Sequence, residues 1–598
     1  MLRTAPRQST VPHTASRSSI PRRVGPAFLV VFGLSACAAS GQVPVDMTPP
    51  LSAQEMSVSG AFLAGRHADR MRDVASASVF MDRVVASGDT GIALKRRAFL
   101  LRLEDGRYEE AARLAPEIID TLEANAPIAN LFLAVEAARV GDFDQAATLI
   151  GQLPDNRLNR ILNPLLDGWI ALGQGRREDA ERAIEGVQEL DGFSVLHALH
   201  SALLADAAGE TDLAADRYDA AVSAMADPPL RIRLMAANFQ ARFAGLEAAM
   251  ETVLADESGA ADPADIEAYL TWVRETRKGL HPSAVDGLAQ AFFDLASALQ
   301  RDRRSELGMV FSRLSLRLDP DFDLATLLIA EILDDRGQHA RALALYDRVP
   351  ENSAYRLMAE LRAVSSLEDK GRAADAVNRL EALARSRPSL LEPLIRLGDL
   401  YRAQENWKDA VSAYDRAFSR VPEGETAAWS LYYSRGIALE RNSQWDRAEA
   451  DFLKALEIRP EQPYVLNYLG YTWIDQGRHL PRATRMIEQA VALRPNDGYI
   501  VDSLGWAMYR QERYEEAVKH LERAVELRPT DPTINDHLGD AYWRVGRHQE
   551  ARFQWRRALS FEPTRELAAI IEQKLEAGLP AARSNTLRTA DTKSDVEG

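Results

Sequence analysis

Small residues recur at regular intervals between residues 390 and 565. Gly436, Gly470, Gly505 and Gly539 are separated by 34, 35 and 34 residues, with large apolar residues between them. An alanine follows each glycine by about twelve residues, a second alanine lies seven residues further on, and a proline comes five residues later. Glycine and alanine let two helix backbones approach closely, whereas proline ends a helix. The pattern therefore predicts consecutive two-helix hairpins.

This period and its residue types resemble the tetratricopeptide repeat. The segment "LIRLGDLYRAQENWKDAVSAYDRAFSRVP" has the family's outline at Leu394, Leu397, Gly398, Tyr401, Ala410, Tyr414, Ala417 and Pro422. Upstream the pattern weakens, and only a Gly-x4-Ala motif is kept, from Gly106 to Gly371. We expect an all-α fold, a right-handed superhelical α-solenoid of about 14 hairpins between residues 58 and 565.

The sequence divides into eight segments by composition and by the strength of this pattern. We interpret them as a lipoprotein signal peptide (1–36), a flexible tether (37–57), a degenerate N-terminal array (58–255), an irregular insertion or loop (256–288), a second degenerate array (289–389), a consensus-like array (390–565), a capping helix (566–577) and a disordered tail (578–598).

Composition and charge agree with this interpretation. Hydrophobic residues make up 46% of the chain and aromatic residues 7%, with few runs of β-branched residues, which favours helices. The first 36 residues hold five arginines and no acid, so the remaining 67 basic and 88 acidic residues give a formal charge of −21. Because phosphate binding relies on Lys and Arg, this acidic balance argues against nucleic acid as a partner.

The N-terminus is typical of a secretory signal. Basic residues precede the apolar run Val24 to Leu34, which is too short to span a bilayer, and "LSAC" follows with the only cysteine of the chain. This resembles a bacterial lipobox, which implies lipidation (palmitate) of Cys37. Ala38 after it suggests the outer membrane, with the chain facing the periplasm. The alternative is that Ala36 to Ala38 is an ordinary cleavage site.

The resemblance also implies a binding groove. In the family, the second, fifth, ninth, twelfth and thirteenth positions of each repeat lie on one face of the first helix. Seven of nine Trp and eleven of sixteen Tyr lie beyond residue 390, and aromatic residues dominate binding hot spots. The predicted groove residues are Tyr433, Tyr464, Asn467, Tyr471, Tyr499, Asp502, Trp506, Tyr509, Arg510, Asp536, Asp540, Trp543 and Arg544.

Two other interpretations of these residues remain. The aromatic rings can instead fill gaps between repeats, as we expect of Trp407, Trp445 and Trp473. The groove of chaperone-binding relatives holds a C-terminal carboxylate with Lys and Asn. The aspartates of the predicted groove oppose that ligand, although they can bond a ligand backbone.

Signals for catalysis or metal binding are weak. The chain has no P-loop, G-x-S-x-G, H-E-x-x-H or paired-cysteine motif. His197 and His200 lack a third ligand at metal-binding spacing, and we interpret them as surface or packing residues. The cluster of Asp536, His537 and Asp540 is interpreted as part of a repeat rather than as a catalytic site. We therefore expect no enzyme activity, no metal and no cofactor.

The order "NYLGYTW … DSLGWAMYR … NDHLGDAYWR … ARFQWRRAL", together with the lipobox, resembles large bacterial tetratricopeptide-repeat lipoproteins. Some members are adaptors that hold a periplasmic C-terminal processing protease together with cell-wall hydrolases, and others support envelope assembly or secretion. The resemblance implies a membrane-anchored scaffold whose aromatic groove contacts one protein partner and whose N-terminal array contacts another. The alternatives are a self-assembling envelope scaffold and an enzyme with a site within residues 256–290.

Overall fold

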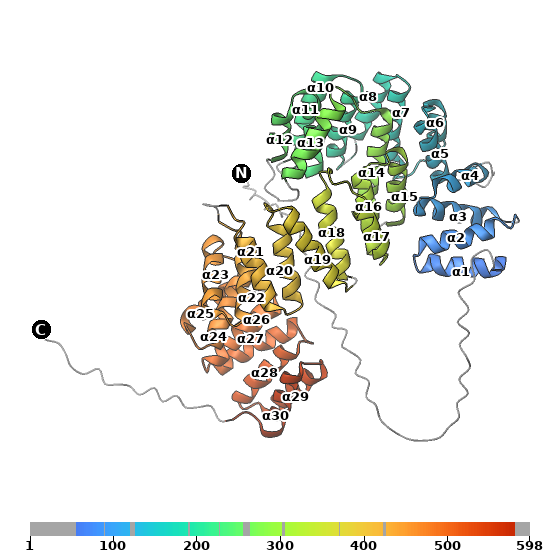
Figure 1. The fold of residues 1–598 in the computed structure, drawn as a ribbon. Helices are drawn as coiled ribbons and strands as arrows, with labels where there is room; N and C mark the ends of the chain where they lie inside the picture. Colours follow the sequence, from blue (N-terminus) through green and yellow to red (C-terminus); the bar gives the residue numbers. More distant parts are fainter. Residues whose placement is uncertain are drawn as a thin grey trace, which may run out of the picture. The chain divides into compact units, whose positions relative to one another are not determined.

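The computed structural model describes residues 56–580 apart from 89, 120–125, 189, 191, 226–227, 255–262, 302–304, 370 and 423–425. In this part of the chain we find 30 α-helices and no strand (Figure 1). The prediction of an all-α solenoid of helix hairpins is confirmed. The N-terminal segments, with Cys37, and the C-terminal tail beyond residue 580 lie outside the described residues.

The helices pack mainly as consecutive hairpins. The first six hairpins are α1 (Val58–Arg70) with α2 (Val74–Val85), α3 (Ile92–Asp105) with α4 (Tyr108–Ile119), α5 (Pro127–Arg139) with α6 (Phe143–Ile150), α7 (Asn159–Gly173) with α8 (Arg177–Gln188), α9 (Ser194–Ala207) with α10 (Thr211–Ser223), and α11 (Leu230–Phe243) with α12 (Leu246–Leu254). Next come α13 (Pro263–Arg277), α14 (Ala284–Arg301), α15 (Ser305–Leu318), α16 (Asp323–Asp335), α17 (His339–Tyr346), α18 (Arg356–Asp369) and α19 (Ala373–Ser386).

The consensus-like repeats are five further hairpins followed by one helix. They are α20 (Glu392–Ala403) with α21 (Trp407–Phe418), α22 (Trp429–Arg441) with α23 (Trp445–Ile458), α24 (Pro463–Asp475) with α25 (Leu480–Leu493), α26 (Gly498–Arg510) with α27 (Tyr514–Leu527), α28 (Pro532–Arg544) with α29 (His548–Ser560), and then α30 (Arg565–Ala577). Gln462, Asp497 and Asp531 precede α24, α26 and α28 as N-caps, each accepting a bond from a backbone N–H of the first turn.

The periodic glycines lie where the two helices of a hairpin cross. A Cβ built on Gly398 would lie 2.4 Å from the Tyr414 ring, one on Gly436 would lie 2.7 Å from Phe452, and one on Gly539 would lie 2.5 Å from Trp555. No real Cβ tolerates such distances. The period of 34 therefore reflects a steric requirement: a glycine on the first helix leaves room for a large side chain of the second helix, which is aromatic at Gly436 and Gly539 and aliphatic at Gly470 and Gly505.

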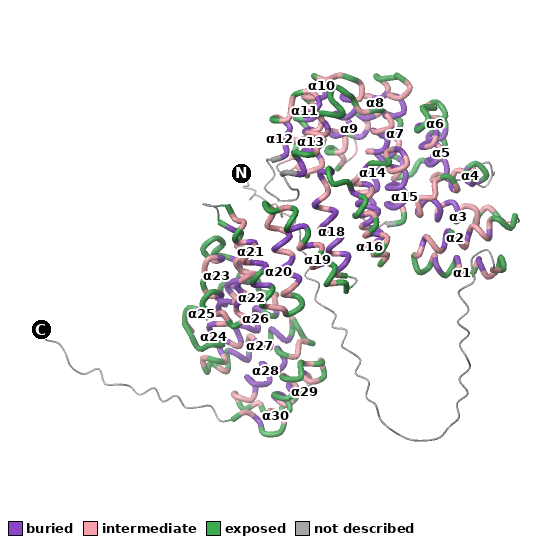
Figure 2. The backbone as a smooth tube through the Cα atoms, in the orientation of Figure 1, coloured by how far each residue is buried: buried purple, intermediate pink, exposed green. Residues whose placement is uncertain are grey.

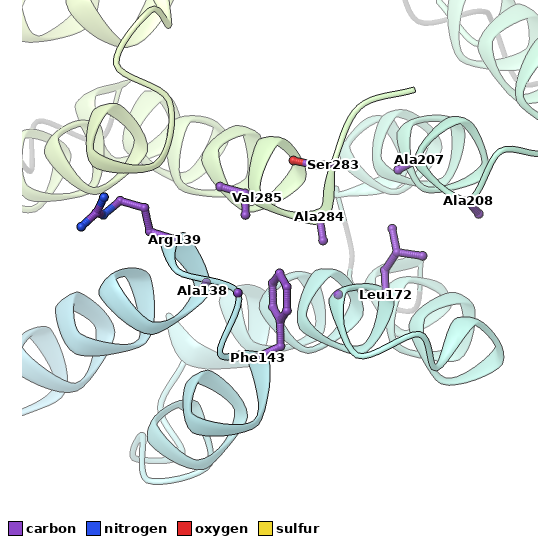
Figure 3. Close-up of a pocket in the computed structure, with 11 residues that line it drawn as sticks. Ala138, Arg139, Phe143, Leu172, Ala207, Ala208, Ser283, Ala284 and Val285 are labelled. Carbon is purple, nitrogen blue, oxygen red and sulfur yellow. The ribbon is translucent and has the colours of Figure 1, made fainter. Parts of the chain in front are cut away.

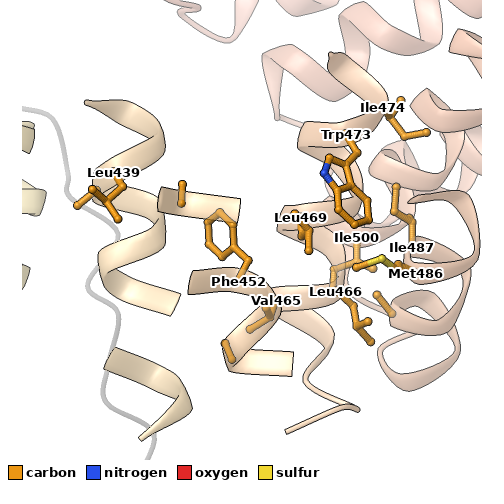
Figure 4. Close-up of a cluster of buried hydrophobic side chains, with 14 of the residues drawn as sticks. Leu439, Phe452, Val465, Leu466, Leu469, Trp473, Ile474, Met486, Ile487 and Ile500 are labelled. Carbon is orange, nitrogen blue, oxygen red and sulfur yellow. The ribbon is translucent and has the colours of Figure 1, made fainter. Parts of the chain in front are cut away.

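One apolar core runs through the C-terminal repeats. It is continuous from Val364 to Ile571, with buried side chains supplied by both helices of each hairpin. Figure 2 shows the buried positions along α20 to α28, and Figure 4 shows the part of the core around Phe452, Leu469 and Trp473. Trp473 is 1% exposed, so this ring fills a gap between repeats, as the alternative interpretation expects.

The expectation of an irregular segment at 256–288 is wrong for most of its described residues. They form α13 and the start of α14, and α13 packs on α11 and α12 through Ile266, Leu270 and Val273. These three residues have helical spacing (i, i+4, i+7), but the helix lacks a Gly-x4-Ala partner. A search for the repeat pattern therefore passes over it.

The hairpin of α14 and α15 packs against α7, α9, α5 and α3, which are the first helices of earlier hairpins. A Cβ on Gly287 of α14 would lie 2.1 Å from the Trp169 ring. Arg313 of α15 donates from Nε to the carbonyl oxygen of Glu104 at 2.9 Å, and burial lowers the pKa of this arginine. The chain's own α14 and α15 thus pack on the first helices of four earlier hairpins of the N-terminal array.

Candidate protein-binding surface

We refer to the predicted groove residues of α22, α24 and α26 together as the aromatic surface. Tyr464 and Tyr499 are the most exposed of its aromatic residues, at 43% and 49%. Arg510 is also exposed, and its Nη1 lies 3.0 Å from Oδ1 of Asp475 on the preceding repeat. The half-buried members are Tyr433, Asn467, Tyr471, Trp506 and Tyr509.

Burial affects the chemistry of these tyrosines. Burial, and then the nearby carboxylates of Asp502 and Asp475, raise the pKa of Tyr471 to about 12, and burial raises the pKa of Tyr433 to about 12. Both hydroxyls are therefore neutral donors at physiological pH. An apolar ring with a neutral hydroxyl is suited to contact with a peptide, because it offers area and one directional bond.

A stack of rings lies at the α26 end of the aromatic surface. The Trp506 ring is 4.8 Å from Tyr509 with planes 10° apart, and 4.1 Å from His537 with planes 15° apart. His537 Nδ1 lies 3.0 Å from both carboxylate oxygens of Asp502. Burial disfavours a charged imidazole, but Asp502 outweighs it, so the pKa of His537 is raised. The carboxylate of Asp502 is therefore bonded to His537 within the protein. The expectation that Asp502 faces a ligand is corrected.

Two polar atoms near the aromatic surface have no hydrogen-bond partner in the described residues. They are Oδ1 of Asn467 and Nε1 of Trp506, and both atoms are buried. Leaving such a group unpaired costs about 1–3 kcal/mol, so native proteins rarely do so without a reason. Because both atoms are inaccessible to solvent, they mark a local cost within the fold rather than groups presented to another chain.

The last predicted groove residues are covered by α30 and the residues after it. Nζ of Lys574 lies 2.7 Å from Oδ2 of Asp536 and 2.8 Å from Oδ2 of Asp540. Trp555 donates from Nε1 to Oδ1 of Asp540 at 3.0 Å. Burial, and then repulsion by Asp536, raise the pKa of Asp540 to about 6. These carboxylates hold the capping helix, and no oxygen of theirs is left for a ligand backbone.

Trp543 and Arg544 meet the same segment. A Cβ on Gly578 would lie 2.1 Å from the Trp543 ring, and Arg544 donates from Nη1 to the carbonyl oxygen of Pro580 at 2.7 Å. We therefore correct the expectation that these two residues, together with Asp536 and Asp540, face a ligand. The family's groove positions do not foresee this, because Lys574 lies outside the repeats whose spacing defines them.

The histidines that resembled ligands have other partners. His200 is buried, accepts a bond at Nδ1 from Trp169 Nε1 at 3.0 Å, and has Nε2 3.2 Å from Asp294. Within the described ranges, no group of three or more His, Cys, Asp or Glu side chains is placed to hold a metal ion. None of the described helices has the length and apolar character that crossing a membrane requires.

The N-terminal array has a shallow hollow of about 550 Å³ beside the start of α14. Phe143, Leu172 and Val285 supply its larger apolar side chains, and Phe143 points into the space between the helix ends (Figure 3). Its remaining lining is chiefly small residues, so it offers little for directional recognition.

Comparison with known proteins gives the same repeat. Residues 395–463 and 433–483 match the family described as Tetratricopeptide repeat, and residues 505–546 match the family described as TPR repeat. A TPR repeat-containing protein of Pseudomonas aeruginosa is 27% identical over 199 residues, which is 33% of this chain and 33% of that protein. The aligned region thus spans a third of the relative's length.

Two solved structures are similar at low identity. The Cut9-Hcn1 hetero-tetramer of the APC/C has a chain that is 13% identical, covering 88% of this chain and 97% of that chain with a TM-score of 0.35. MamA is 20% identical, covering 28% of this chain and 94% of that chain with a TM-score of 0.25. The chain therefore contains tetratricopeptide repeats over residues 395–483 and 505–546, within an all-α array of helix hairpins.

Proposed function

We propose that this chain is a non-enzymatic scaffold that binds a protein partner on the aromatic surface of α22, α24 and α26. The observation that carries the proposal is the exposure of Tyr464 and Tyr499 at equivalent positions of consecutive repeats. Large rings that remain in solvent on a repeat surface are typical of binding hot spots.

The location belongs to the same proposal. A lipid on Cys37 would hold the chain on the periplasmic side of a bacterial envelope, in the outer membrane, with residues 37–57 as the tether. The support is the order of basic, apolar and small residues before the only cysteine. In such a place the scaffold would serve as an adaptor that docks a protease or cell-wall hydrolases.

In vivo photocrosslinking tests the aromatic surface. A photoreactive phenylalanine analogue at Tyr499 should give discrete crosslinks to envelope proteins, whereas the same analogue at Phe553 of α29, which is 57% exposed, should not. In pull-downs with a partner so identified, Tyr464→Ala/Tyr499→Ala should weaken binding by about thirtyfold, since hot-spot truncations cost about 2 kcal/mol or more. Equal crosslinking at both positions would contradict the proposal.

A self-assembling scaffold is the second candidate. It would give crosslinks from Tyr499 to a second copy of this chain, together with a concentration-dependent mass in light scattering of the lipid-free protein. A monomer over the measured range with crosslinks to other proteins supports the adaptor.

A further inference from the structure

The first helix of the array, α1, leaves one side in solvent. A Cβ on Gly65 would lie 3.3 Å from Phe80 of α2, and the residues buried on that side of α1 are Ala61, Gly65 and Ala68. The exposed residues on the opposite side follow the helical spacing i, i+3, i+4, i+7, and they are Leu63, Arg66, His67 and Arg70. Together with Met71 and Arg72, which come directly after the helix and are also exposed, we call them the outer face of α1.

Two large apolar side chains of the outer face lie in solvent. Leu63 is 67% exposed and Met71 is 66% exposed, and in the part of the chain that the structure describes only Val140, at 71%, is a more exposed large hydrophobic residue. A single exposed apolar residue is ordinary on a protein surface. Here two of them lie among arginines, and apolar side chains gain free energy when another surface covers them.

The arginines of the outer face have no ion-pair partner within the described ranges. They are Arg66, Arg70 and Arg72. Asp69, the only acid of α1, instead pairs with Arg97 of α3, whose Nε lies 3.0 Å from Oδ2. Asp73 caps α2 and accepts from the backbone N–H of Ser76 at 3.2 Å. The outer face therefore carries uncompensated positive charge, on a chain in which acidic residues outnumber basic ones.

The position of α1 in the chain indicates what covers this face. Twenty residues lie between Cys37 and the first residue of α1, and even fully extended they reach only about 70 Å, at about 3.5 Å per residue. A lipid on Cys37, on which this step rests as part of the proposed function, would therefore keep α1 close to the membrane. The helix that follows the anchor directly is thus the one with an apolar and basic outer face.

The residue types of the outer face suit an anionic phospholipid surface. Helices that lie in a membrane interface combine apolar side chains, which enter the headgroup region, with basic residues, and arginine binds phosphate well. We propose that the outer face of α1 rests on the anionic phospholipid surface of the membrane and orients the helix array on it. Two apolar residues and three arginines form a weak contact by themselves, so this contact adds to a lipid anchor and does not replace it.

Vesicle cosedimentation tests this contact in a chain that carries no lipid. The protein is the chain from residue 37 with Cys37→Ser, which keeps every described helix. The probes are vesicles of phosphatidylglycerol and phosphatidylcholine in equal parts, and vesicles of phosphatidylcholine alone. At physiological ionic strength, where charges more than about 8 Å away are screened, we expect at least about tenfold stronger partition onto the anionic vesicles, since each arginine near such a surface changes partition by about fivefold. Equal partition onto both kinds of vesicle would overturn the proposal.

Arg66→Gln/Arg70→Gln should lower partition onto the anionic vesicles by about tenfold or more, because two cations of the outer face are removed. The matched control is Arg482→Gln/Arg485→Gln on α25, where both arginines are exposed and the change of net charge is the same. Partition of the control should be unchanged, and thermal unfolding checks that both variants are folded. Equal losses in the two double variants would show that net charge governs binding and would contradict the assignment to the outer face.

An environment-sensitive dye reports whether the outer face meets the lipid. The Cys37→Ser chain has no cysteine, so Leu63→Cys gives a single labelling site. The emission of the dye should shift to the blue with anionic vesicles, whereas a dye at Leu280→Cys, where the leucine is 58% exposed, should show no shift. An unshifted emission at Leu63→Cys would contradict the contact. Neither vesicle experiment depends on lipidation, and failure of the proposed anchor would instead appear as absent palmitate labelling in cells.

Discussion

At the scale of single residues, the ammonium group of Lys574 attaches the last helix to the repeat array. Lys574 of α30 bonds both Asp536 and Asp540 of α28, and all three side chains are largely buried. Two buried carboxylates next to each other repel, which is why the pKa of Asp540 is raised even beside a lysine. The acids that first suggested a ligand site therefore serve to attach the capping helix.

Lys574→Met should destabilise the chain in a pH-dependent way. The folded-state pKa of Asp540 is about 6, above its ordinary value near 4, so its contribution is complete below pH 4 and is lost as pH rises through 6. Without the lysine this loss deepens and extends upward, because the carboxylate then has no cation. We expect a loss of about 3 kcal/mol at pH 8 and a clearly smaller loss at pH 5, measured by urea unfolding.

Lys454→Met is the matched control, since Lys454 forms an exposed ion pair with Glu457 at 2.8 Å. It should leave the unfolding midpoint unchanged at both pH values. A loss for Lys574→Met that is the same at pH 5 and pH 8 would show that the carboxylates are not responsible.

At the scale of elements, glycine positions determine which helices can meet. Gly287 lets α14 lie against Trp169 of α7, a contact between helices more than a hundred residues apart. Arg317 strengthens the docking of the hairpin, with its Nε 2.6 Å from Oε1 of Glu136 on α5. The hairpin of α14 and α15 thus packs on the first helices of earlier hairpins, whereas our proposed function places a protein partner on the C-terminal repeats.

Gly287→Ala tests this docking. A Cβ at this position would lie 2.1 Å from the indole ring, so the helix must shift, and we expect a loss of about 1–3 kcal/mol despite the better helix propensity of alanine. Gly186→Ala in α8 is the control, because a Cβ there meets only Pro164 at 4.0 Å. It should raise stability by about 0.5–1 kcal/mol. Equal effects of the two substitutions in thermal unfolding would contradict the role given to Gly287.

At the scale of the whole molecule, the chain combines two kinds of array. The C-terminal repeats share one continuous core and expose an aromatic surface, whereas the N-terminal hairpins are joined by α14 and α15. In our proposal one chain carries both a membrane tether and a protein-binding surface, which suits a scaffold, since linking two binding events raises their effective concentration.

The anchor belongs to this scale too. Cys37→Ala should move the protein from the membrane fraction to the soluble fraction and abolish labelling with a palmitate analogue, because lipid chains on that residue would supply the attachment. Ala38→Ser keeps the cysteine and should leave both readouts unchanged. A Cys37→Ala protein that stays in the membrane fraction would mean that another part of the chain binds there.

The repeat period was sufficient to predict the fold class and the sites of helix crossing, because a close approach needs Gly or Ala at a fixed position. It could not show that Asp502 bonds His537, or that Lys574 neutralises Asp536 and Asp540. Those pairs join residues 34 to 38 positions apart. The repeat pattern indicates which residues share one face of a helix, but it does not indicate which other helix packs on that face.

The sequence alone determined that this chain is an array of helix hairpins with aromatic residues concentrated in its C-terminal repeats. Only the tertiary structure decided which of these rings stay in solvent, which are covered by α30, and that the chain's own hairpin of α14 and α15 packs on the N-terminal array. The reason is physical. The small residues that let neighbouring helices pack lie at fixed spacings in the sequence, so they can be found there. Docking of α14, α15 and α30 instead depends on surfaces that exist only after the array has folded.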